Sequence, residues 1–349
     1  MVLLTVAVTT LHDKYYNPQE SSIVYYSPKT TMVFDFTYQE KTYEKGPFAQ
    51  YAEELLGIEN AVTENKTTYQ MKHVSILTRT DVDLERAHKV SAEAGVPIQL
   101  LTITDKGLLK GYNLPEGGKN RDKNTNTSTE RSKAKQETVP SFPEEILEAK
   151  SEAEQAQLIA KQIFRLRETR TYLLSGEVEH APADGTAMKL VLDELDKQEK
   201  QFVSLFTGKT TTTIKHKKVN YCPSEQTGKV YKEQLFFSEE NGFTDAENID
   251  AQKVVIQAVF QRQHIDTVVT EVPKDKKGKK TIEPSQIVYN LPGYANVVVT
   301  YKNETMATKT MPIAQFGIDM PLSKDLFTGK ELPVIVVSEK TGNIVSISK

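Results

Sequence analysis

The pattern of hydrophobic and polar positions changes twice along the chain. In residues 1–118, large side chains recur at every second position, as at Met32, Phe34, Phe36 and Tyr38. A period of two is typical of a β-strand with one buried face. This part of the chain is predicted to hold a short helix over residues 48–56, ended by Gly57, and strands over residues 22–26, 31–38, 68–80, 96–104 and 108–112.

Residues 141–208 follow a helical period instead. Apolar side chains recur at alternating steps of three and four, which predicts two amphipathic helices. Gly176 and Gly208 end the two apolar stripes, and Ser141 and Glu144 have capping-box spacing before the first. The segment is therefore predicted to be an antiparallel helical hairpin. Its stripes are Ala156, Ile159, Ile163, Leu166 and Leu173, then Met188, Val191, Leu195, Phe202 and Leu205.

Strand patterns return after the second helix, and one stretch before the first helix has no pattern at all. Residues 119–140 are rich in Lys, Asn, Thr and Ser and lack apolar periodicity, which is typical of a mobile linker. The strands predicted after residue 209 cover residues 210–221, 230–237, 254–272, 287–301 and 332–347.

These patterns predict an α+β fold that is predominantly β. A chain of 349 residues is too long for one hydrophobic core, so several domains are expected. The expected order is a β-rich domain over residues 1–118, the linker over 119–140, the helical hairpin over 141–208 and a second β-rich domain over 209–349. Both β-rich domains are expected to be β-sandwich-like.

An internal echo suggests that the two β-rich domains are duplicates. Thr37-Tyr38 matches Thr300-Tyr301, and a Pro-x-Ala-Gln-aromatic element occurs at residues 47–51 and again at 312–316. Chance similarity among strands rich in Thr and Tyr is the competing interpretation. A true repeat would mean that the two stretches occupy equivalent places in two similar domains.

Composition narrows the function classes. The net charge of −3, with 44 basic against 47 acidic residues, argues against nucleic acid as a partner. A single cysteine excludes an intrachain disulfide framework and a multi-cysteine metal site. The apolar run from Val2 to Val8 is too short for a transmembrane segment and lacks the preceding Lys or Arg of a signal peptide.

No motif identifies a cofactor or a metal, so neither is expected. Gly208-Lys209-Thr210 looks like the end of a phosphate-binding loop, but it follows a helix rather than a strand. His180 lies among acidic residues in the hairpin loop, where an exposed acidic loop is the simpler interpretation than a metal cluster. Cys222 has only His216 near it in sequence as a base, which gives little support for a catalytic thiol.

The helical hairpin contains a candidate structural ion pair. Arg170 takes a place in the apolar stripe of the first helix, and a charge in such a place needs a partner. If the hairpin turns midway between residues 176 and 186, Arg167 and Arg170 face Glu194. An anion-binding site is the alternative use of these arginines.

Four stretches of the sequence belong together: Tyr26 with Pro28-Lys29-Thr30, Gly46–Ala52 with Leu56-Gly57, Leu205–Gly208, and Pro312–Gly317. They resemble one uncharacterised bacterial family, known as domain of unknown function 4831. The resemblance spans nearly the whole chain and implies an exported protein of the periplasm or cell envelope, whereas the cysteine count also suits the cytoplasm. It implies no activity and no catalytic residue.

Two function classes follow from the sequence. The first is a non-catalytic cell-envelope binding or assembly protein, whose partner would be another envelope protein or a glycan. The second is a glycosidase-like hydrolase whose paired carboxylates cannot be picked out among the many acidic residues. The first class is favoured because no catalytic motif is evident.

Overall fold

The computed structural model describes residues 16–17, 22–91, 96–115, 144–177, 184–224, 226–245, 250–263 and 284–348. The predicted linker over 119–140 lies outside these residues. So do Ser141 of the predicted capping box, His180, and the last part of the strand predicted over 254–272.

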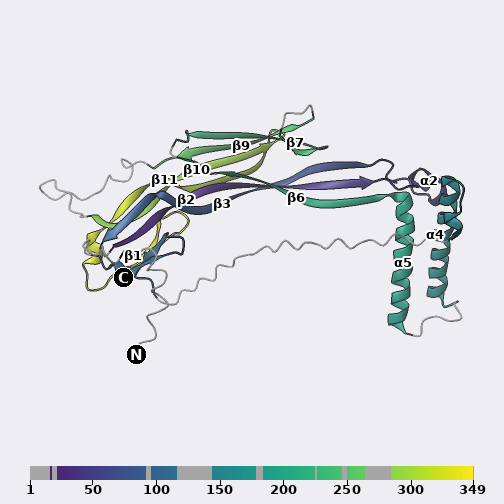
Figure 1. Ribbon diagram of the computed structural model, residues 1–349, viewed down its shortest axis with the longest axis horizontal. Helices are drawn as coiled ribbons and strands as arrows, with labels where there is room; N and C mark the ends of the chain where they lie inside the picture. Colours follow the sequence, from purple (N-terminus) through teal and green to yellow (C-terminus); the bar gives the residue numbers. More distant parts are fainter. Residues whose placement is uncertain are drawn as a thin grey trace.

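Two very long antiparallel strands form the backbone of the molecule. β2 (Ser22–Glu44) pairs with β3 (Lys66–Ser91) along its whole length, and β6 (Lys209–Tyr221) pairs with β2 from Met32 to Glu44. We call the three-stranded part the ribbon. In Figure 1 the ribbon extends beyond the other sheets and carries the helices at its far end. The two-residue strand β1 (Tyr16–Asn17) pairs with the start of β2.

The strands predicted over residues 22–26 and 31–38 are one strand. Pro28 has no N–H to give to a ladder, and proline is tolerated beside irregularities in strand pairing. The pairing of β2 with β3 shifts between Tyr26 and Ser27, next to Pro28, and β2 continues past it. β3 also runs eleven residues beyond the predicted end at Thr80.

Two further sheets complete the β-structure. One has the order β11-β10-β9-β7-β8, and the other has the order β13-β12-β5-β4. The strands of the first are β7 (Val230–Ser238), β8 (Gly242–Thr244), β9 (Gln252–Gln261), β10 (Pro284–Tyr301) and β11 (Glu304–Ser323). Those of the second are β4 (Leu101–Ile103), β5 (Leu109–Tyr112), β12 (Val334–Val337) and β13 (Ile344–Ser348). Short 3-10 turns, η3 (Ile98–Leu100) and η4 (Lys324–Phe327), lead into and out of these sheets. β11 was not predicted from the sequence.

Each large β core combines both halves of the chain. In the first core, Phe34 and Phe36 of β2 pack with Ile256, Val297 and Ile313 of the five-stranded sheet. The second core joins residues 23–112 to residues 287–337, and β5 pairs directly with β12. The boundary between an N-terminal and a C-terminal β-rich domain therefore runs through both cores.

The echoed Thr-Tyr pairs share one core rather than lying in two. Tyr38 and Tyr301 both contact the ring of Phe237, with ring centroids 5.8 Å away in each case. The Pro-x-Ala-Gln-aromatic elements adopt different structures: residues 49–51 form the 3-10 turn η1 (Ala49–Tyr51), and residues 312–316 lie in β11. The element therefore does not recur in the same secondary structure.

The helical hairpin forms an arm across the far end of the ribbon. α4 (Glu152–Ser175) is capped by Ser151 and ends at Gly176; α5 (Gly185–Thr207) is capped by Asp184 and ends at Gly208. A third core gathers the base of the arm against α2 (Ala52–Leu56), with Ile159, Ile163 and Phe206 almost fully buried. The short helix α3 (Glu144–Leu147) adds Ile146 to this core. No helix among the described residues has the length and apolarity to cross a membrane.

Candidate functional site

A largely buried polar cluster lies where β2 and β3 meet the other two sheets. Ser27 comes from β2, Arg86 and His88 from β3, Asn290 from β10 and Asp319 from β11. Asn290 has 1% of its surface exposed and Ser27 has 5%, so these groups have left bulk water. Polar groups in such a place must find partners within the protein.

Arg86 is the centre of the cluster. Its guanidinium donates to both carboxylate oxygens of Asp319, to the carbonyl oxygen of Ala314 at 3.2 Å and to Oδ1 of Asn290 at 3.1 Å. The amide of Asn290 in turn donates to the carbonyl oxygens of Ala314 and Thr341. A planar arginine fork suits such multiple bonding. The cluster therefore ties β3, β10, β11 and the loop before β13 together.

Ser27, His88 and Asp319 bring together the side-chain types of a hydrolase triad, but their geometry does not form one. A triad histidine bridges its serine and its carboxylate through different ring nitrogens. Here Nε2 of His88 lies 2.8 Å from Ser27 Oγ and also 3.6 Å from Asp319 Oδ2. The Asp319 carboxylate binds Arg86 instead, so it does not orient the imidazole for proton transfer.

The histidine of the cluster is held in its neutral form. Burial lowers the pKa of His88, and the nearby Arg86 charge lowers it further, while Asp319 acts in the opposite direction. Neutral imidazole accepts or donates one hydrogen bond at each nitrogen, which fits its contact with the Ser27 hydroxyl. The cluster thus resembles a structural clamp more than reaction machinery.

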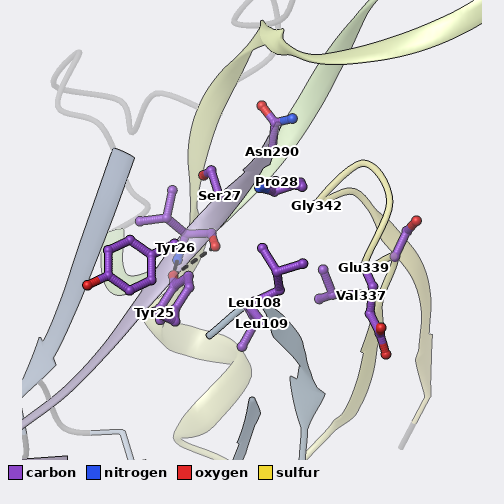
Figure 2. Close-up of a pocket in the computed structure, with 12 residues that line it drawn as sticks. Tyr25, Tyr26, Ser27, Pro28, Leu108, Leu109, Asn290, Val337, Glu339 and Gly342 are labelled. Atoms are coloured by element: carbon purple, nitrogen blue, oxygen red, sulfur yellow. Dashed lines mark hydrogen bonds between the residues drawn. The ribbon is translucent and has the colours of Figure 1, made fainter. Parts of the chain in front are cut away.

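A small cavity adjoins the clamp, as Figure 2 shows. Its volume is about 10 Å³, and its lining includes Tyr25, Ser27, Leu108, Asn290 and Gly342. That volume is close to what one water molecule needs and is far below the usual size of a ligand pocket. The cavity therefore has no room for a substrate.

Tyr25 beside the cavity is fixed by the backbone of β10. Its hydroxyl donates to the Val288 carbonyl oxygen at 2.8 Å and accepts from the Val288 N–H at 2.7 Å. Burial raises the pKa of Tyr25 well above its usual range, although the Val288 hydrogen bond acts in the opposite direction. A phenol in this state stays protonated, which suits a structural link between β2 and β10.

A larger depression lies open on the ribbon near the helical arm. It has a volume of about 480 Å³ and is lined by residues 42–45 and 65–67. Lys41 and Lys66 stand over the Tyr43 ring, and the bond from Lys41 lowers the pKa of Tyr43. Glu44 is the only carboxylate in the lining, whereas glycoside hydrolysis usually needs two.

The arginines expected to face Glu194 find other partners. Arg167 pairs with Glu199 at 2.7 Å and Arg170 pairs with Asp196 at 2.9 Å, both across the hairpin. Glu194 pairs with Lys197 on its own helix. The expected Glu194 pairing is thus corrected. The helices are offset, so Arg167 meets a residue five positions later in α5 than the assumed turn implied.

Other residues singled out in the sequence have structural surroundings. Gly208 has a positive φ of 71° at the junction of α5 and β6, and a Cβ there would lie 2.4 Å from the Glu44 carbonyl oxygen. Its place is a tight helix-to-strand junction. Cys222 is exposed, and its Sγ lies 3.8 Å from the Thr30 carbonyl oxygen. In the described part of the chain, no group of three or more His, Cys, Asp or Glu side chains is placed to hold a metal ion.

The sequence reading did not identify the Arg86 clamp. Residues 81–89 mix Asp, Glu, Arg, His and Lys, which breaks the apolar alternation that marks a strand. The available signal was Asn290, a polar residue inside an apolar strand pattern at residues 287–301. Such a residue is buried only with partners, so it predicts a polar network nearby.

Comparison with known proteins finds one matching family model. The family model described as Domain of unknown function (DUF4831) matches residues 21–345. No curated protein matches the chain, and no solved structure matches it.

Proposed function

The chain belongs to the DUF4831 family, and from its architecture we propose that it is a non-catalytic binding or assembly protein of the bacterial cell envelope. The observation that carries this proposal is the ribbon with its helical arm. In Figure 1 both extend away from the two sheets that hold the large β cores.

The exposed surface of the ribbon and arm supports a binding role. Along β6, 11 of the 13 residues are exposed, and only Val219 and Tyr221 are half-buried. Toward the tip of the arm, Leu174 and Leu190 are 65% and 67% exposed. Such surface contributes little to the cores of this chain, and exposed apolar side chains favour contact with a partner.

The compact part of the molecule supports the same proposal through its clamp. Arg86, Asp319 and Asn290 are occupied with one another and with main-chain carbonyl groups. A cluster so engaged stabilises the junction of three sheets. The five-stranded sheet packs on β2 and β3. We propose that these two layers form a β-sandwich-like support from which the far end of the ribbon projects.

The envelope location and the partner are also proposed. The exported character that the family resemblance implies favours the periplasm or cell envelope, with another envelope protein or a glycan as partner. The cytoplasm is the alternative location. The hydrolase alternative gains no support from the depression on the ribbon, which has a single carboxylate.

The test combines fractionation with chemical crosslinking in the native cells. A tagged full-length protein should be found in the envelope fraction and should crosslink to the same partner in repeated preparations. Crosslinks are expected from lysines of the ribbon, such as Lys217. Recovery in the cytosol without a reproducible partner would contradict the proposal, as would turnover of glycosides by the purified protein.

A further inference from the structure

Strand β6 lies at the edge of its sheet in the part of the chain that the structure describes. β6 pairs with β2 along its length, and among the described residues it has no second strand partner. Figure 1 shows β6 along the side of the ribbon, between the body of the protein and α5. An unpaired strand edge of this length presents main-chain groups that bind another extended chain.

The direction of the β6 main-chain groups follows from the hydrogen bonds of its neighbours. In an antiparallel ladder, residues alternate between bonding one neighbouring strand and the other. The N–H of Tyr69 in β3 donates to the Glu239 carbonyl oxygen at 2.7 Å, which points it away from β2. Its partner Glu40 therefore bonds β6, where it faces Thr213.

A second contact gives the same alternation. The main chain of Thr30, ten residues before Glu40, binds the Gln315 side chain through both its N–H and its carbonyl oxygen. Even-numbered residues of β2 thus turn their main-chain groups toward the β6 side. The register between β2 and β6 has no shift. Odd-numbered residues of β6 therefore bond β2, and the even-numbered residues point outward: Thr210, Thr212, Ile214, His216 and Lys218.

The charges along β6 indicate what kind of strand would fit. The strand carries Lys215, Lys217 and Lys218 and has no acidic residue. Lys215 pairs with Glu40 at 2.6 Å, while the nearby Asp35 carboxylate contacts His216 at 3.1 Å. Lys217 and Lys218 form no ion pair with the described residues. Ile214, with 52% of its surface exposed, lies between these charges and a run of threonines.

We propose that the free edge of β6 binds an extended segment of a partner protein, by strand addition, with acidic residues opposite Lys217 and Lys218. The inference rests on the proposed binding function and specifies its partner. Main-chain hydrogen bonds would supply affinity, and the lysines would select an acidic sequence. A second copy of this chain is disfavoured, because it would bring further lysines close to these.

The first test uses a synthetic peptide as the probe. The peptide is about nine residues long, enough to span residues 210–218, and alternates threonine and valine around two adjacent glutamates. Its binding to the whole protein is measured by fluorescence anisotropy at low salt. The proposal expects saturable binding that weakens as salt rises. A peptide with alternate N-methylated amides, and one with lysines replacing the glutamates, should bind about tenfold more weakly or worse.

Matched variants locate the binding on β6. Thr212→Pro removes an outward N–H and leaves the bonds between β6 and β2 in place, so affinity should fall about tenfold. Thr212→Val keeps the N–H and should bind like the parent. The double variant Lys217→Glu with Lys218→Glu should lose binding without any change in the backbone, which keeps the test valid if the proline variant misfolds.

Three outcomes would overturn the inference. They are absence of peptide binding, equal binding of the N-methylated peptide, and unchanged binding by both the proline and the glutamate variants. If the parent protein sediments as a dimer and Thr212→Pro does not, the edge of β6 binds a second copy of this chain instead. If Thr212→Pro keeps the crosslinked partner in cells, the proposed function stands and the β6 inference fails. If neither protein has a reproducible partner, the proposed function itself fails.

Discussion

Arginine–carboxylate pairs occur near both ends of the β2–β3 hairpin, and they differ in how far the arginine is buried and in its further bonds. At the body, the Arg86 and Asp319 side chains are 17% and 27% exposed, and further hydrogen bonds satisfy the guanidinium. In the arm, Arg170 and Asp196 are 44% and 32% exposed. Loss of Asp319 leaves the more buried arginine without its main partner, whereas the more exposed Arg170 keeps contact with water when its partner is lost. We therefore expect the Arg86–Asp319 pair to contribute to stability and the Arg170–Asp196 pair mainly to align the two helices.

The helical arm shows the same contrast along its own length. Near the ribbon, Ile159, Ile163 and Phe206 have at most 1% of their surface exposed. Beyond Leu166 in α4 and before Phe202 in α5, neither helix has a buried residue. Apolar packing thus fixes the base, and half-buried ion pairs join the two helices farther out. A region so weakly buried contributes little to stability and is open to a partner.

The largest expected effect comes from the base of the arm. Phe206→Ala should lower the free energy of unfolding by about 4 kcal/mol, because it removes a fully buried ring and leaves a cavity. Leu190→Ala, toward the tip, is the matched control and should change it by less than about 0.5 kcal/mol. Urea unfolding of both variants measures the difference. Equal losses would show that the tip is as tightly packed as the base.

The next largest effect is expected at the clamp. Arg86→Ala should cost about 3 kcal/mol, because Asp319 then keeps a partly buried charge without its partner. Thermal unfolding followed by circular dichroism measures this loss. If the variant melts within a degree or so of the parent, the clamp does not hold the three sheets together.

A smaller effect is expected on the pH dependence of stability. The pKa of His88 is lowered in the folded protein, so the unfolded state binds the proton more readily. The contribution of His88 is therefore complete above the ordinary histidine pKa of about 6.5 and is lost as the pH falls through the lowered value. Between pH 7.5 and 5, His88→Gln should lose less stability than the parent protein. Parallel pH curves for the two proteins would contradict this assignment.

The smallest effect is expected in the arm. Arg170→Ala should cost only about 0–1 kcal/mol, because the arginine of this pair is 44% exposed and the pair is screened by salt. The variant is compared with the parent in urea at low and at high salt, and the small difference should shrink as salt rises. A loss as large as that of Arg86→Ala would remove the contrast between the two ends.

The local parts of the fold could be predicted from the sequence, and the long-range parts could not. The helical hairpin and the alternation around Phe34 and Phe36 are local periodicities, so both were predicted. The pairing of β5 with β12 joins Tyr112 to Ile335, and no short pattern encodes such a contact. The ion pairs show the same limit. Arg170 was expected to have a carboxylate partner, but the choice of Asp196 over Glu194 depends on an offset between helices that the sequence does not reveal.

The candidate site was harder to predict than the fold. Arg86, His88 and Asp319 come together from β3 and β11. Arg86 and His88 lie in a segment where charged residues are common, and the strand that holds Asp319 was not predicted. The free edge of β6 is a property of the sheet order. A strand over residues 210–221 was predicted, but only the three-dimensional arrangement shows that no other described strand pairs with one side of it.

The mixed cores have a consequence for the order in which the chain can fold during synthesis. The ribosome releases β2 and β3 first, and they form a hairpin whose apolar face includes Phe34, Phe36 and Ile76. The strands that cover this face, β9 to β11, follow some two hundred residues later. Until then the hairpin exposes its apolar face, which favours aggregation with other chains. The first core can therefore be completed only once the C-terminal half of the chain is present, and contacts so far apart in sequence are typical of slow folding.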